Sequence, residues 1–125
     1  MSSEPRFSGA LLQALQEAKI LGVRAGREHR YTAVWVVVIE GRVFVRSWSD
    51  KQTGWYRAFL AEPLGSMQVG QREIAMRAKN TRSQRLREAV SLAYGEKYNT
   101  KASQTWVQGF AEPERMSTTL ELVPR

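Results

Sequence analysis

Arg46 lies in the middle of a segment, R-V-F-V-R-S-W-S, that alternates as a strand does. In this pattern the side chains of Phe44, Arg46 and Trp48 share one face. Burying an unpaired guanidinium is costly, so an arginine inside a sheet needs an anion. The planar guanidinium suits a ligand phosphate. The alternative is an exposed Arg46, or one that pairs with Glu40 or Glu73.

The stretch G-W-Y-R-A-F-L-A-E-P (54–63) places Trp55 and Tyr56 side by side, followed by Arg57. Both aromatic side chains combine a large apolar area with a polar tip. Such a pair either fills a core or forms the wall of a pocket, and core packing is the commoner role. If the stretch forms a pocket wall, Arg57 supplies a second guanidinium for an anion.

The sequence carries none of the common catalytic signatures, such as a nucleophile elbow, a phosphate-binding loop or a zinc-protease motif. Without cysteine and with His29 as its one histidine, it offers no thiolate nucleophile and little for a transition-metal site. A Ser-His-Asp triad would need His29 and Asp50 without a recognisable nucleophile. Glu112 and Glu114 are better explained as solvated loop charges than as a catalytic pair.

The net charge is +7, from 19 basic and 12 acidic residues. This balance favours an anionic partner, such as nucleic acid, anionic lipid or a phosphorylated cofactor or substrate. The alternative is a basic, soluble surface without such a partner. Basic residues in 82–97 could follow a phosphate backbone, but Glu88 and Glu96 interrupt them. Specific nucleic-acid recognition is therefore not expected.

No segment of the sequence is suited to a membrane. The longest apolar run, 33–39, is too short to span a bilayer. The start, M-S-S-E-P-R, lacks the apolar region of a signal peptide. We therefore expect a soluble cytoplasmic protein with no membrane partner.

Hydrophobic periodicity predicts two helices and five strands. In chain order they are a helix over 7–20, strands over 31–40 and 42–49, a hairpin of strands over 64–69 and 72–78, a helix over 82–97 and a strand over 117–124. Residues 24–30 and 99–115 are charged or polar and predict irregular connections. Short strands with few helices favour an antiparallel barrel or sandwich of α+β class, within one domain of 125 residues.

Local signals predict where these elements begin and end. Ser8 and Thr81 are predicted as helix caps, the latter with Gln84 in a capping box. Gly22 and Gly95 are predicted as helix stops. Tight turns are predicted at Glu40-Gly41 and Gly70-Gln71.

The stretch from Trp55 to Pro63 resembles the W-Y-x-N-L-x-A-N-P segment of the deazaflavin-dependent nitroreductases. With the pyridoxamine-phosphate oxidases, these belong to the FMN-binding split-barrel superfamily. Gly26-Arg27 with Arg30 and Thr32 is similar to their G-R-x-S-G-x-x-R-x-T-P-L run. Further landmarks resemble a bacterial family of uncharacterised proteins grouped with this superfamily: V-W-V-V (34–37), V-F-V-R-S (43–47), A-Y-G-E-K-Y (93–98) and T-T-L-E-L-V-P (118–124).

This resemblance implies a fold of α+β class, mainly β. It is a split antiparallel β-barrel with an N-terminal helix and a helix after the fourth strand. The stretch 54–63 becomes a short helix ended by Pro63, with Trp55 in the core and Arg57 turned toward an anion site shared with Arg46. The resemblance also implies FMN or deazaflavin bound at the interface of a homodimer.

The Lys-Ser-Gly of the nitroreductase run is replaced here by Glu28-His29. Phosphate contacts are therefore expected near the exit of the second strand, as in pyridoxamine-phosphate oxidases. The cofactor-binding residues implied in this way are Arg46, Ser47, Lys51 and Arg57 at the phosphate, and Trp55 or Tyr56 near the isoalloxazine ring. No catalytic residue is assigned.

The function implied is a flavin-dependent oxidoreductase of unknown substrate. A second hypothesis is a cofactor-free split-barrel protein that is structural or binds a small anion. A third, less favoured, is a basic nucleic-acid-binding module.

Overall fold

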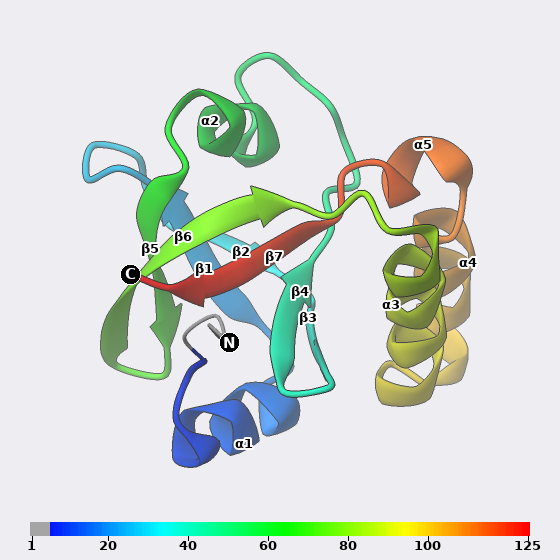
Figure 1. Cartoon of the computed structure of the whole chain (residues 1–125). Helices are drawn as coiled ribbons and strands as arrows, with labels where there is room; N and C mark the ends of the chain where they lie inside the picture. The colour runs from blue at the N-terminus through cyan, green and yellow to red at the C-terminus, as the bar shows by residue number, and fades with distance from the viewer. Residues whose placement is uncertain (1–5) are drawn as a thin grey trace.

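Seven strands form one antiparallel sheet in the order β2-β1-β5-β6-β7-β4-β3 (Figure 1). The computed structural model describes residues 6–125. The strands are β1 (Leu21–Ala25), β2 (Thr32–Val34), β3 (Val36–Ile39), β4 (Arg42–Val45), β5 (Leu64–Val69), β6 (Arg72–Asn80) and β7 (Leu120–Pro124). The predicted fold of α+β class, mainly β, is confirmed.

The two edge strands of the sheet, β2 and β3, are separated in the chain by Trp35 alone. β2 pairs with β1 and β3 pairs with β4, so this segment joins the two ends of the sheet into a nearly closed barrel. The sequence predicted one continuous strand over 31–40. The structure divides it, because its two halves pair with different strands and Trp35 pairs with neither.

Strand β1 was not predicted, because Gly22 was taken as a helix stop and 24–30 as a connector. In the structure Leu21, Val23 and Ala25 alternate into the barrel core. This period of two is the ordinary sign of a strand that is buried on one face. The glycine and arginine between the apolar residues concealed it.

Both tight turns are confirmed. Glu40 and Gly41 have positive φ angles of 55° and 72°, and Gly70 has a φ of 60°. Positive φ is the conformation that glycine adopts without strain. These turns set the registers of the β3–β4 and β5–β6 hairpins.

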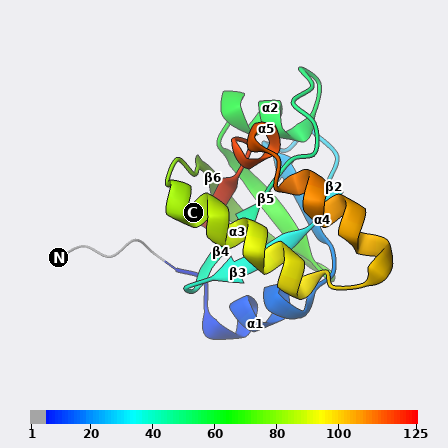
Figure 2. The same ribbon diagram turned by 90° about the vertical axis from the view of Figure 1, so that its right-hand side faces the viewer.

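The helices are α1 (Gly9–Glu17), α2 (Trp55–Ala61), α3 (Gln84–Lys97), a 3-10 turn η1 (Lys101–Ser103), α4 (Gln104–Phe110) and α5 (Pro113–Met116). Helices α3 and α4 lie on one side of the barrel, with α1 and α2 at its ends (Figures 1 and 2). The irregular connection predicted over 99–115 was therefore wrong. Within the described residues, no helix is both long and apolar enough to cross a bilayer.

Helix caps were predicted with mixed success. Ser8 caps α1, since its hydroxyl accepts from the Leu11 N–H at 3.2 Å. At α3 the cap is Ser83, whose hydroxyl accepts from the Leu86 N–H. Thr81 is buried instead, and its N–H donates to the Thr119 carbonyl beside β7.

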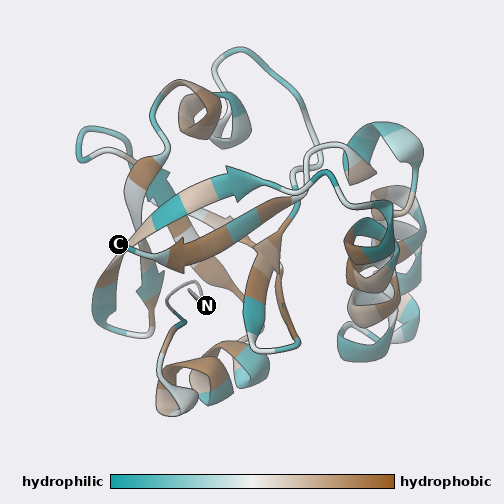
Figure 3. Cartoon of the chain, in the orientation of Figure 1, coloured by the Kyte–Doolittle hydropathy of each residue, from teal (hydrophilic) through white to brown (hydrophobic). Residues whose placement is uncertain are grey.

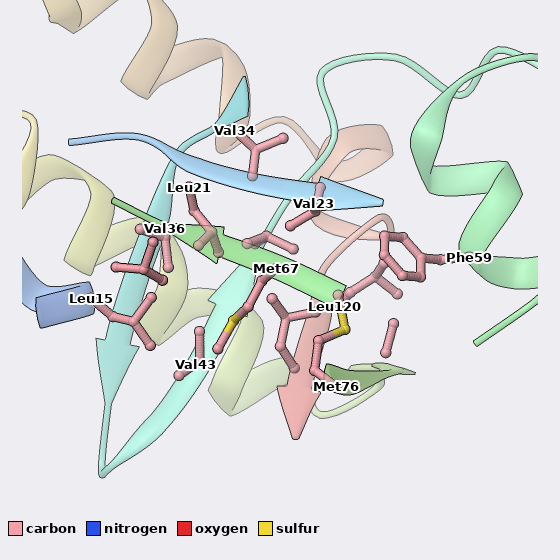
Figure 4. Packing of buried hydrophobic residues seen from close by; sticks show 14 of the residues in the cluster. Leu15, Leu21, Val23, Val34, Val36, Val43, Phe59, Met67, Met76 and Leu120 are labelled. Carbon is pink, nitrogen blue, oxygen red and sulfur yellow. The ribbon is translucent and has the colours of Figure 1, made fainter. Parts of the chain in front are cut away.

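The hydrophobic core has two parts, one on each side of β4. Val43 and Val45 face the barrel interior, where Figure 4 shows Val43 among Leu15, Met67 and Leu120. Phe44 faces the opposite way, toward Val90, Tyr94 and the other apolar residues of α3. Figure 3 shows brown, hydrophobic residues along the strands and on α3. The alternation predicted for 42–49 is thus confirmed over Arg42–Val45, where the strand ends.

Candidate functional site

All four tryptophans of the chain line one pocket. Its volume is about 280 Å³, and its other lining residues are Ala33, Val34, Arg46 and Phe110. Trp106 and Trp48 are 51% and 37% exposed, so they form the mouth. Indole rings gathered on one cavity are suited to stacking on a flat ligand.

The four tryptophans come from four separate parts of the fold. Trp35 is the residue between β2 and β3, and Trp48 lies three residues beyond the end of β4. Trp55 is the first residue of α2, and Trp106 lies on α4. The pocket therefore forms where three parts of the fold meet: the β2–β3 junction that closes the barrel, the end of β4, and α4.

Ring contacts hold the walls in place. Trp35 stacks on Tyr98 with centroids 3.9 Å apart and planes within 5° of parallel. Trp48 meets Trp106 edge-to-face at 4.8 Å and Phe110 at 5.1 Å. Such pairs add stability beyond the area they bury. The rings are thus largely ordered before any ligand arrives.

Arg115 fixes Trp48 from its other side. Its guanidinium carbon lies 3.6 Å from the centroid of the Trp48 ring. Its Nε donates to the Trp48 carbonyl at 2.9 Å, and its Nη1 donates to the Gly109 carbonyl at 3.2 Å. A side chain on Gly109 would overlap the Trp48 ring, so glycine is what lets α4 approach it.

Arg46 lines the pocket and is 1% exposed. Its acceptors are the hydroxyls of Thr119 and Ser91 and the backbone carbonyls of Phe110 and Arg87, at 2.8 to 2.9 Å. These four bonds use four of the five guanidinium N–H groups. Burial lowers the pKa of Arg46 to about 10, so it stays protonated at neutral pH. None of the ion pairs found in residues 6–125 includes Arg46.

The comparisons with known proteins agree with this fold. The model of DUF2255, a family of uncharacterized proteins conserved in bacteria, matches residues 10–122. The chain belongs to this family. The matched residues of this DUF2255 member include β1 to β4 and every residue that lines the tryptophan pocket.

A solved structure with the same fold is the conserved hypothetical protein Rv2991 from Mycobacterium tuberculosis. It superposes on this DUF2255 chain with a TM-score of 0.61 at 15% identity, over 98% of this chain and 82% of the other. At that identity the likeness concerns the fold alone. No curated protein matches the chain. The resemblance to a bacterial uncharacterised family is confirmed, and membership of the FMN-binding superfamily stays a prediction.

Two of the six predicted site residues of the DUF2255 chain, Arg46 and Trp55, line the same pocket. Ser47 is buried, and its N–H and carbonyl both bond the Thr118 hydroxyl, which ties the chain to the start of β7. Tyr56 lies in the barrel core, at 8% exposure.

Lys51 and Arg57 lie outside the pocket. Lys51 is exposed in the turn before α2. Arg57 is exposed and makes a two-pronged pair with Asp50, at 2.7 and 2.9 Å. This pair raises the pKa of Arg57. The anion site that was predicted between Arg57 and Arg46 is not assembled.

The sequence left two roles open for both Trp55 and Tyr56, either core packing or contact with a cofactor ring, and the predicted short helix placed Trp55 in the core. The structure separates them, with Tyr56 in the core and Trp55 half-buried at the pocket. The sequence did not predict four of the pocket residues, Trp35, Trp48, Trp106 and Phe110. One signal was present for Trp48, because the strand predicted over 42–49 placed it on the same face as Arg46.

A second cavity of about 200 Å³ lies beside the first, and Trp55 lines both. Its polar and basic lining comes from Arg24, His29, Arg30, Thr32 and Thr53. Arg24 already bonds Ser66 and Glu73. Arg30 is exposed, which leaves this cavity with a cationic group at its surface.

Proposed function

We propose that the protein binds a flavin or deazaflavin, with the flat ring system in the tryptophan pocket, and acts as a flavin-dependent oxidoreductase. The observation that carries this proposal is that all four tryptophans line one cavity above a buried guanidinium. Four ring faces favour a planar ligand, and the charge of Arg46 favours a ligand with electron-rich edges.

The dimensions of the two cavities support a ligand with a ring and a polar tail. The tryptophan pocket, at about 280 Å³, lies near the lower limit of small-molecule sites, which begin at roughly 300 Å³. It suits the ring system without the tail. The neighbouring cavity across Trp55 holds Arg30 and Thr32, the residues that match the nitroreductase run.

In this proposal, different residues of the chain bind the ring system and the tail of the ligand. Trp35, Trp48 and Trp106 stack on the ring and exclude water from it. Arg46 orients the ring through its charge. Its hydrogen bonds to protein also leave one N–H for a ligand oxygen. Arg30 and Thr32 hold a phosphate-bearing tail. The flavin itself would supply the hydride chemistry.

We also propose that a second copy of the chain covers the mouth of the pocket. Trp48 and Trp106 are exposed there, and exposed apolar surface of this kind commonly marks an interface. A homodimer with twofold symmetry would bury both rings.

The decisive experiment is equilibrium binding of FMN, riboflavin and a deazaflavin, followed by calorimetry and by the visible spectrum of the bound ligand. We expect saturable binding and a shifted spectrum. Trp106→Ala should weaken binding about tenfold or more, since stacking on one aromatic side chain is worth roughly 1–3 kcal/mol. Leu92→Ala, at an exposed residue of α3 that does not line the pocket, should change nothing.

An unchanged spectrum at saturating ligand, with no heat of binding, would overturn the flavin proposal. Binding of small aromatic or anionic compounds without any flavin would then favour the cofactor-free hypothesis. Tight, salt-resistant binding to one DNA sequence would favour the nucleic-acid hypothesis instead.

A further inference from the structure

Among residues 6–125, no carboxylate pairs with Arg46. All four of its acceptors are neutral hydroxyl or carbonyl oxygens. Burial is the main cause of the lowered pKa of Arg46, and the charge of Arg87 acts in the same direction. The Tyr94 phenol, whose own pKa is raised by burial, is uncharged at neutral pH. A buried cation without a counter-ion is an unusual arrangement, because its desolvation is offset by hydrogen bonds alone.

The lining of the tryptophan pocket contains no acidic residue. Two acidic residues that are close in sequence to residues lining the pocket already form ion pairs. Asp50, two residues beyond Trp48, pairs with Arg57, and Glu112 pairs with Arg115. The interior of the pocket therefore carries net positive charge.

We infer that the pocket selects aromatic anions and rejects aromatic cations, and that Arg46 sets this preference. The ligand class is a planar ring system that carries a carboxylate or another negative charge conjugated with, or attached to, the ring. This inference rests on the proposed function only in that the pocket must bind aromatic rings, and it holds for ligands other than flavins.

A group of tryptophans could instead be a cage for cations, because the face of an indole ring is electron-rich and attracts ammonium groups. Two features decide against that here. One face of Trp48 is already covered by Arg115, at 3.6 Å from the ring centroid. A cationic ligand would also approach Arg46 in a cavity of low dielectric, where like charges repel strongly.

An anion gains from the same arrangement. Its negative charge offsets the unbalanced charge of Arg46 without breaking any bond that Arg46 makes to the protein. One guanidinium N–H, on Nη2, has no acceptor among the described residues, and in this proposal it donates to a ligand oxygen. Hydrogen bonds between charged groups are stronger than neutral ones.

The test uses the unmodified protein and three ligands that share the indole ring system and differ in charge. Indole-3-acetate is an anion at pH 7, indole-3-acetamide is its neutral equivalent, and tryptamine is a cation. We expect the acetate to bind about tenfold more tightly than the acetamide by calorimetry, as a charge-assisted contact provides. Tryptamine should bind more weakly than the acetamide.

Equal Kd values for the acetate and the acetamide would overturn the inference while leaving an aromatic pocket in place. Tighter binding of tryptamine would overturn it in favour of a cation cage. If none of the three ligands binds, and flavins do not bind either, the pocket itself fails and the inference fails with it. Flavin binding with no charge preference among the indoles would keep the proposed function and remove this inference.

Two variants test whether Arg46 causes the preference for an anionic ligand. In Arg46→Met the ratio of the acetate and acetamide affinities should fall toward one, whereas Arg46→Lys should keep most of it. Arg57→Met removes a guanidinium outside the pocket and should leave the ratio unchanged. Circular dichroism establishes that each variant is folded. If Arg46→Met does not fold, the ligand series on the unmodified protein still decides the inference.

Discussion

Trp55 and Phe59 lie on the same short helix but have different surroundings. Phe59 is 2% exposed in the barrel core, whereas Trp55 is half-buried and lines two cavities. We expect Phe59→Ala to lower the free energy of unfolding by about 3–5 kcal/mol, as truncation of a core aromatic does. Trp55→Ala should cost less stability and should weaken ligand binding.

Urea unfolding followed by circular dichroism measures the first effect, and calorimetry with a flavin or an indole ligand measures the second. Phe59→Ala should be assayed well below its unfolding midpoint. Greater destabilisation by Trp55→Ala than by Phe59→Ala would show that Trp55 is a core residue after all.

Lys97 bridges two elements through its ammonium group, which donates to the carbonyls of Leu15 and Val36 at 3.0 and 2.7 Å. Burial, with a smaller contribution from the charge of Lys19, lowers the pKa of Lys97 from 10.5 to about 8. The unfolded chain therefore binds more protons than the folded chain between about pH 8 and pH 10. Stability should rise with pH across this window.

The measurement is the urea midpoint between pH 7.5 and pH 9.5, in the unmodified protein and in Lys97→Met. The variant should show a flatter profile, because methionine does not titrate. Burial raises the pKa values of Tyr94 and Tyr98, so these residues reduce stability only at higher pH. Parallel profiles for the two proteins would contradict the assignment to Lys97.

At the scale of elements, two helical glycines offer a matched comparison. A Cβ on Gly95 of α3 would make an ordinary van der Waals contact with Val107, at 3.7 Å. A Cβ on Gly109 of α4 would overlap the Trp48 ring. Alanine is the better helix former by up to about 1 kcal/mol. Gly95→Ala should therefore be neutral or stabilising, and Gly109→Ala should destabilise by about 1–3 kcal/mol through overpacking.

Thermal unfolding of the two variants measures these changes, and calorimetry should show weaker ligand binding in Gly109→Ala alone. The clash falls on a ring that Arg115 holds from its other side, so Trp48 cannot simply move away. If the two alanines raise the midpoint equally, α4 does not pack against Trp48 in solution.

The elements that the sequence predicted well are those with a regular local signal. The β3–β4 and β5–β6 hairpins have glycine at their turns and alternating flanks, and α3 has Leu86, Val90 and Tyr94 at helical spacing. β1 was missed because Gly22 interrupts its apolar residues and resembles a helix stop. Helix α4 was missed because its buried face consists of little more than Phe110.

The site was harder to predict than the elements. Arg46 and Trp55 could be found, because one stands out on a strand face and the other belongs to a recognisable motif. Trp35 and Trp106 are brought together only by barrel closure and by the packing of α4 against α3. No local pattern encodes either event, so the pocket could not be derived from residue spacing.

At the scale of the whole molecule, we expect a homodimer. Trp48 and Trp106 are exposed at the pocket mouth, and a contact between copies there would remove both from water. Sedimentation at micromolar concentrations should show twice the monomer mass. Trp106→Glu should shift the equilibrium toward monomer, and Leu92→Glu on α3 should not. Sedimentation as a monomer at every concentration would exclude this assembly.

Strand β7 comes last of the seven in the chain but lies between β6 and β4 in the sheet. During synthesis the other six strands emerge first, as two pieces whose facing edges have no partner. Unpaired edges are templates for association with other chains. The barrel can close only when β7 arrives, so the nascent protein has an interval of exposure to aggregation that a chaperone would shorten.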